Sequence, residues 1–255
     1  MEIRESVAFV LNGQPVTLGE VLKLSKIERS FPALDNKRRM VLIEQLAADR
    51  GAACTFDELQ QGVNRYRKEL GLYSSEETKR WLDDNGLSLE DLADAVKPRI
   101  LREKLVAGIP SDRVKAYFAG HRRQFDAARL SRIVASDAGT ARELKFRLRE
   151  GADFGLLARE FSIEEETRYA YGYVGIVGRT EMSPEESSAV FGAADGDIVG
   201  VLTTPRGYEL IRIERILRAV MDDKTENRIR SLLFEEMLET FEADAVTEMT
   251  IWKRT

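Results

Sequence analysis

Cysteine and histidine are almost absent from this chain, which has one of each, Cys54 and His121, in 255 residues. A single cysteine cannot form an internal disulfide bond, and one cysteine with one histidine cannot supply the usual ligands of a zinc site. Cys54 also has no histidine partner that would activate it as a nucleophile. We therefore expect no disulfide, no metal site and no cofactor.

Long apolar runs are missing as well. Nowhere does the sequence approach the roughly 18 consecutive apolar residues that a membrane-spanning helix needs. The first residues, MEIRESVAFVLNG, place acidic side chains before a short apolar run, whereas a secretory signal peptide has a basic start and a longer apolar stretch. These features predict a cytoplasmic protein that has no membrane partner.

An excess of positive charge is the third absence, because 39 Lys and Arg residues face 44 Asp and Glu residues and give a net charge of -5. Domains that bind nucleic acid usually present a strong basic surface, so we expect no nucleic-acid partner. What the chain does have is 43% hydrophobic residues, enough for one large domain or two smaller ones with separate cores.

The first half of the sequence has helical periodicity after a short alternating segment. The run VAFVLNGQPVT alternates around an Asn-Gly turn and predicts a strand or hairpin, followed by a helix capped by Thr17. Capping-box spacing marks three more helix starts, at Thr55, Ser74 and Ser88. Pro98 stands inside the helix that follows Ser88 and predicts a kink or an interruption there.

Beyond Asp126 the pattern becomes mixed. ARLSRIVAS predicts a strand, the next segment predicts two helices divided by Gly151, and GYVGIVGRTEM is glycine-rich and strand-like. A short helix in PEESSAVFGA precedes a hairpin that turns at Pro205 to Gly207. The sequence closes with an amphipathic helix, TENRIRSLLFEEMLETFEADA, and an alternating strand, VTEMTIWKR.

Four stretches between residues 130 and 214 carry a resemblance: GADFGLLAREFS, YGYVGIVGRTEMSPEESSAVF, GDIVGVLTT and GYELIRIE. This block resembles the parvulin-type peptidyl-prolyl isomerases, also called PpiC or rotamase domains, and each of the four stretches matches the family pattern without gaps. Four stretches of the helical part resemble the N-terminal domain of the SurA and PrsA class of folding factors. They are VLNGQPVTLGEV, LIEQLAADRG, NGLSLEDLADAVKPRILREKLV and VKAYFAGHRRQF. Together the two resemblances cover nearly the whole chain.

The resemblance implies an α+β protein with two domains. Residues 1–125 are expected to form a helical, SurA-like peptide-binding domain that residues 219–255 complete. Residues 126–218 are expected to form an inserted parvulin domain, a four-stranded antiparallel sheet with flanking helices. The two terminal strands could pair within one chain or between copies. Their apolar faces consist of Val7, Phe9 and Leu11 in the first strand and Met249 and Ile251 in the last.

The resemblance also assigns candidate site residues. Met182 and Phe191 match the Met and Phe that form the family's apolar proline pocket, so both are predicted to bind substrate. The family's first-strand histidine, last-strand histidine and acidic or cysteine position fall on Arg132, Glu209 and Tyr173. All three polar positions therefore depart from the family pattern, which leaves open whether the chain is an enzyme.

Three interpretations of the substituted positions are open. In the first, Arg132 and Glu209 form an ion pair that holds the sheet together, because either charge buried alone would be costly. In the second, the trio is a new site, with Glu209 as acid or base, Arg132 as an anchor for a carboxylate or carbonyl, and Tyr173 as a donor. In the third, ordinary isomerase activity survives, because rotation about an X-Pro amide breaks no bond.

We therefore expect a folding factor that binds unfolded or extended polypeptide clients and has weak or lost isomerase turnover. The alternatives are an active peptidyl-prolyl isomerase and a partner or modifying protein in ribosomal peptide maturation, whose client is a precursor peptide. His121 is interpreted as a surface or packing residue. The acidic run Glu164 to Glu166 is interpreted as a solvated turn, and the basic run after Asn36 as a solvated helix face.

Overall fold

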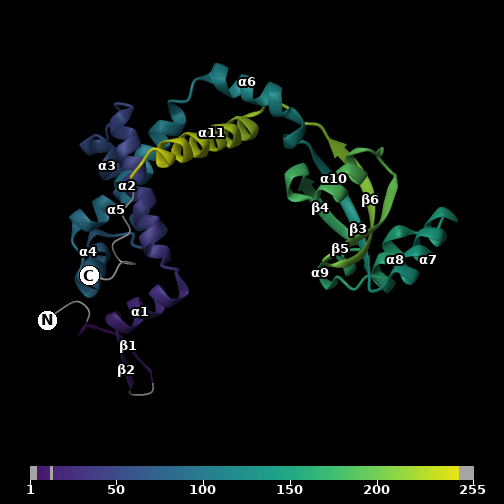
Figure 1. Cartoon of the computed structure of the whole chain (residues 1–255), viewed down its shortest axis with the longest axis horizontal. Helices are drawn as coiled ribbons and strands as arrows, with labels where there is room; N and C mark the ends of the chain where they lie inside the picture. Colours follow the sequence, from purple (N-terminus) through teal and green to yellow (C-terminus); the bar gives the residue numbers. More distant parts are fainter. Residues whose placement is uncertain (1–4, 12–13, 247–255) are drawn as a thin grey trace. The chain divides into compact units, whose positions relative to one another are not determined.

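The computed structural model of the chain describes residues 5–11 and 14–246. It divides into two compact units, one from the described parts of Met1–Ile109 and Arg230–Thr255, the other from Pro110–Ile229. Figure 1 follows the chain through both units. The sequence-based boundaries fall after residues 125 and 218, so the second compact unit also contains residues 110–125 and 219–229, which the sequence assigns to the helical domain.

The first unit contains a two-stranded hairpin and a group of helices. Its strands pair antiparallel, with Leu11 opposite Gln14, and the expected turn at residues 12–13 lies outside the described residues. The expected terminal strand with Met249 and Ile251 also lies outside them. The elements are β1 (Val7–Leu11), β2 (Gln14–Thr17), α1 (Leu18–Glu28), α2 (Pro32–Asp49), α3 (Phe56–Glu69), α4 (Ser75–Asn85), α5 (Leu89–Ala107) and, from Arg230 onward, α11 (Asp223–Ala243).

The helix starts predicted from capping residues are confirmed. Thr17, Thr55, Ser74 and Ser88 each accept a hydrogen bond from the backbone of the third helical residue, whose carboxylate reaches back to the cap. The predicted interruption at Pro98 is wrong, because α5 runs unbroken from Leu89 to Ala107 with Pro98 buried inside it. Contacts with α2 and α3 hold this helix along its length.

The core of the first unit lies between α2, α3, α5 and the last helix. Leu46 of α2 and Phe234 of α11 are both fully buried. Gly62 allows close approach of α3 to α5, because a Cβ at this position would lie 2.6 Å from Cδ1 of Ile100.

The basic run near the start of α2 is not simply a solvated face. Arg38 forms an ion pair with Glu242, and Arg39 pairs with Glu235 at 2.5 Å, both partners lying in α11. The interpretation from sequence missed these contacts because their partners lie about 200 positions away.

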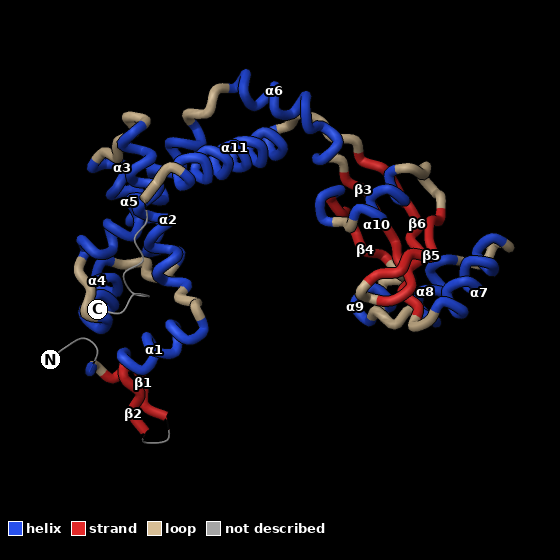
Figure 2. The backbone as a smooth tube through the Cα atoms, in the orientation of Figure 1, coloured by secondary structure: helices blue, strands red, loops and turns tan. Residues whose placement is uncertain are grey.

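The second unit is built on a four-stranded antiparallel sheet in the order β4-β3-β6-β5, which Figure 2 shows with its helices. The predicted order of strands and helices is confirmed, with one short helix added inside the acidic run. The elements are α6 (Ser111–His121), η2 (Arg122–Phe125), β3 (Ala127–Ala135), α7 (Ala138–Arg149), α8 (Phe154–Phe161), α9 (Glu165–Arg168), β4 (Tyr173–Gly178), η3 (Arg179–Glu181), α10 (Pro184–Phe191), β5 (Ile198–Thr204), β6 (Gly207–Leu217) and the start of α11.

Helices cover both faces of this sheet. On one face Ile133 and Leu210 pack with residues of α7 and α8, such as Leu144. On the other face Leu130 and Ile213 pack with Val190 and other residues of α10 (Figure 1). The expected α+β fold class is therefore confirmed. In the described part of the chain, no helix is long and apolar enough to cross a membrane.

Candidate functional site

A pocket of about 170 Å³ opens on the face of the sheet that carries α10. Arg132 and Ile211 are cross-strand neighbours in β3 and β6, so their side chains share this face. The apolar part of the lining consists of Leu130, Val174, Val177, Met182 and Ile211. The charged part consists of Arg132, Glu181, Glu186 and Arg206.

Arg132 is held by a carboxylate from the acidic run. Its Nε donates to Oε2 of Glu164 at 3.1 Å, and its Nη2 donates to Oε1 at 2.6 Å, so the contact is bidentate. Both side chains are about 17% exposed. Thr167 donates a further hydrogen bond to Glu164 at 2.6 Å. The acidic run is therefore not a solvated turn, since its first residue fixes the orientation of the Arg132 guanidinium.

Glu209 is fully buried and pairs with a different arginine. Its Oε1 accepts hydrogen bonds from Nε of Arg206 at 2.7 Å and from the hydroxyl of Thr204 at 2.5 Å. Nη2 of Arg206 also donates to Oε1 of Glu186 at 2.7 Å. Arg206 thus ties the β5–β6 turn to the first turn of α10.

The ionisation of these groups follows from their partners. Burial alone raises the pKa of Glu164, but the hydrogen bonds from Thr167 and Arg132 outweigh it and hold the pKa below its ordinary value. Burial also raises the pKa of Glu186. The hydrogen bonds from Ser183 and the positive charge of Arg206 outweigh this effect and hold the pKa below its ordinary value. The carboxylates of Glu164 and Glu186 therefore remain ionised at neutral pH, paired with Arg132 and Arg206.

The expected ion pair between Arg132 and Glu209 is not formed, since Glu164 binds Arg132 and Arg206 binds Glu209. In the pairing of β3 with β6, Arg132 lies opposite Ile211 and Glu209 lies opposite Val134. Arg132 and Glu209 therefore share one face of the sheet but do not lie directly opposite each other. Glu164, the residue before α9, and Arg206, in the hairpin turn, occupy them instead.

Tyr173 does not join the other two substituted positions. It lines a separate hollow together with Ser131, Arg212 and Glu214, none of which lines the pocket that contains Arg132. Its side chain is 49% exposed. The trio of Arg132, Tyr173 and Glu209 is therefore not assembled as one three-residue site.

Of the two predicted substrate-binding residues, Met182 lines the pocket and Phe191 does not. Phe191 packs against the sheet core on the α10 side. The guanidinium of Arg179 lies 3.9 Å from the centre of its ring, and Arg179 also lies 3.7 Å from a carboxylate oxygen of Asp126. Phe191 thus belongs to the core on the α10 side, while Met182 lines the pocket.

Sequence reasoning missed the charged residues that hold the site together, Glu164, Glu186 and Arg206, and also Glu181 on its rim. One signal was present, because Ser183 and Glu186 have capping-box spacing at the predicted short helix. That spacing fixes Glu186 at the helix start but does not reveal that its other oxygen meets Arg206.

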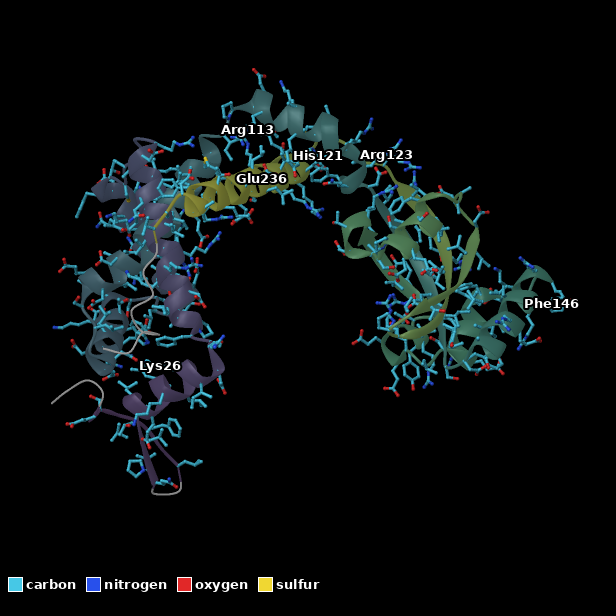
Figure 3. All side chains as sticks on the ribbon, viewed as in Figure 1. Lys26, Arg113, His121, Arg123, Phe146 and Glu236 are labelled. Carbon is cyan, nitrogen blue, oxygen red and sulfur yellow. The ribbon has the colours of Figure 1, made fainter. Side chains whose placement is uncertain are left out.

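Neither the single histidine nor the single cysteine lines the pocket. His121 is exposed on α6 (Figure 3), where its ring stacks on Tyr117 and its Nδ1 lies 2.9 Å from the Tyr117 carbonyl oxygen. This confirms the surface interpretation of His121. Burial, and next the charge of Glu58, raise the pKa of the Cys54 thiol. Within residues 5–11 and 14–246, no His, Cys, Asp or Glu cluster could hold a metal ion.

The sequence of the second unit matches a known family. Residues 131–215 match the rotamase family, described as the PPIC-type PPIASE domain. The chain is 27% identical over 190 residues to the foldase protein PrsA of Caldanaerobacter subterraneus subsp. tengcongensis, a match that covers 74% of this chain and 58% of the relative. It is 25% identical over 194 residues to the foldase protein PrsA of Halalkalibacterium halodurans, covering 73% and 58%. The chain thus spans less than two thirds of the length of these relatives.

A solved structure has the same fold. The crystal structure of the peptidylprolyl isomerase PrsA from Bacillus anthracis superposes with a TM-score of 0.52 at 21% identity, covering 82% of this chain and 97% of that one. Most of the residues that line the pocket fall within the family match, residues 131–215. The chain thus contains a PpiC-type rotamase domain, and PrsA foldases are among its homologues.

Proposed function

We propose that the parvulin-like unit binds an apolar residue of an extended polypeptide, such as proline, in the pocket on the α10 face, with weak or no isomerase turnover. The observation that carries this proposal is the division of the pocket into an open apolar floor, which includes Met182, and a polar flank whose two arginines are already paired with carboxylates.

The pairing argues against efficient turnover. A catalyst of X-Pro rotation has to favour the twisted amide over the planar one, against a barrier of about 18–20 kcal/mol. Polar groups that assist must be free to bond the amide. Arg132 uses Nε and Nη2 on Glu164, and Glu209 is fully buried beneath Arg206. The apolar floor is available to a client, whereas these two positions are committed to intramolecular contacts.

The first prediction concerns Met182. Met182→Ala is expected to weaken the binding of a fluorescent proline-containing peptide to the full chain about fivefold, because it removes roughly 1 kcal/mol of apolar contact. Fluorescence anisotropy measures this affinity. Met221→Ala is the matched control, since Met221 is partly exposed and does not line the pocket. If the two variants bind the peptide with equal affinity, the peptide does not bind in the pocket.

Turnover is tested separately, in a refolding reaction limited by proline isomerisation. We expect the full chain to slow client aggregation and to leave the slow refolding phase unchanged. A refolding rate that rises in proportion to added protein would instead establish an active isomerase. A role in ribosomal peptide maturation and a cytoplasmic location remain predictions, and identification of the co-purifying client and cell fractionation test them.

A further inference from the structure

The charges around the pocket do not cancel. Two guanidiniums line it, and both contact carboxylates within 4 Å. Three carboxylates surround these two cations and leave one negative charge in excess. The cations are Arg132 and Arg206, and the carboxylates are Glu164, Glu186 and Glu209. An incoming anion would therefore find both cations occupied and a surplus of like charge.

Glu181 adds a fourth carboxylate on the rim. It is the last residue of η3, lines the pocket and is exposed to solvent. Its side chain folds against Gly178, where an added Cβ would lie 2.8 Å from Oε1 of Glu181. Among the described residues its carboxylate has no hydrogen bond and no ion pair. The rim thus carries a negative charge that has no partner among the residues that the structure describes.

The nearest cations in sequence and space have other contacts. Arg179 lies on the ring of Phe191 and faces Asp126. Arg228 donates to the hydroxyl of Thr180 at 3.1 Å and lies 5.4 Å from the ring centre of Phe125. Neither arginine lines the pocket, and neither forms an ion pair with Glu181 among the described residues, so Glu181 keeps its charge available to a ligand.

Glu181 immediately precedes Met182, so the free carboxylate and the apolar floor belong to adjacent residues. Their Cα atoms are about 3.8 Å apart, which is also the spacing of neighbouring residues in an extended ligand. We propose that the pocket selects polypeptide segments in which a lysine or arginine neighbours the apolar residue, and that Glu181 sets this preference. The inference rests on the proposed function of the pocket and names the class of client that it takes.

The test uses the full chain and three fluorescent peptides that differ only in the residue before a central proline, which is Lys, Gln or Glu. The Lys peptide is expected to bind about threefold tighter than the Gln peptide, and the Glu peptide about threefold weaker, as for a partly exposed ion pair. Added salt should reduce both ratios. A second series places the variable residue after the proline, because either neighbour of a bound proline can face Glu181.

Glu181→Gln is expected to bring the Lys-to-Gln affinity ratio close to one. Glu185→Gln is the matched control, because it removes the same charge from an exposed position in the first turn of α10 that does not line the pocket. This control should keep the threefold ratio. A parent chain with equal affinity for Lys and Gln peptides in both series, or a Glu181→Gln variant that retains the preference, would overturn the proposal.

The two proposals fail in different ways. If the Gln peptide does not bind, or binds the Met182→Ala variant with the same affinity as the parent chain, the pocket is not the client site and the proposed function fails. If the Gln peptide binds through Met182 but peptide charge has no effect, the proposed function stands and only the role of Glu181 is rejected.

Discussion

Arg206 shows at the scale of a single residue how the substituted site is stabilised. Its guanidinium bonds Glu209, which is fully buried, and Glu186, which is 12% exposed. The hydrogen bond to Glu209 and the charges of Glu209 and Glu186 raise the pKa of Arg206 above its ordinary value, against the opposing effect of burial. A buried carboxylate is tolerated here because the cation is supplied three positions earlier, on the hairpin turn.

Removal of that cation should be costly. Arg206→Gln leaves the Glu209 carboxylate buried without its ionic partner, and we expect the free energy of unfolding to fall by about 3 kcal/mol. Urea denaturation followed by circular dichroism measures the loss. Arg215→Gln in β6, the strand that carries Glu209, is the control, because Arg215 is exposed, and its effect should stay within about 0.5 kcal/mol. Similar losses in both variants would show that the ion pair contributes little.

At the scale of a single element, Glu58 in the capping box of α3 also joins this helix to α5. Glu58 accepts a hydrogen bond from the backbone of Thr55 at 2.7 Å and two from Nζ of Lys104 in α5, at 2.7 and 2.9 Å. The hydrogen bonds from Lys104 first, then those from Thr55, lower the pKa of Glu58 from 4.5 to about 2. The same carboxylate therefore begins α3 and anchors it to α5.

This lowered pKa predicts a specific pH dependence. Because the folded-state pKa lies below the ordinary value, the stabilisation by Glu58 is complete above about pH 4.5 and is lost as the pH falls toward about 2. The melting temperature of Glu58→Gln should lie below that of the parent at pH 7, and the difference should vanish near pH 2. Glu103→Gln, which removes an exposed pair with Arg65, should change the melting temperature little at any pH. A difference that persists at pH 2 would contradict the assignment.

At the scale of the whole molecule, each compact unit has its own hydrophobic core. Leu46 is fully buried in the first unit, and Ile133 is fully buried in the second. A unit with its own core can lose stability without unfolding the other.

We therefore expect local effects from core substitutions. Leu46→Ala and Ile133→Ala should each destabilise their own unit by about 3 kcal/mol. Hydrogen exchange measured by mass spectrometry should accelerate only within Pro110–Ile229 for Ile133→Ala, and only in the other unit for Leu46→Ala. Faster exchange throughout the chain in either variant would show that the two units unfold as one.

Local signals in the sequence predicted most elements but few contacts. Capping boxes at Thr55, Ser74 and Ser88 located helix starts because a cap is satisfied within three residues. The interruption predicted at Pro98 does not occur, because packing of α5 overrode the local preference of proline. The pairing of Arg132 also failed, because residue type and spacing do not reveal that the tertiary structure brings Glu164 to its guanidinium.

The sequence by itself determined the order of strands and helices, because this order depends on residue type and short-range periodicity, and the family resemblance identified Met182 as a pocket residue and the loss of the usual imidazoles. Only the tertiary structure decided which other apolar residues line the pocket, which carboxylate neutralises which arginine, that Tyr173 lies in a different hollow, and that Glu181 has no partner among the described residues. The physical reason is that a charge is neutralised by whichever opposite charge lies within a few ångströms, and that distance is set by the packing of segments far apart in the chain.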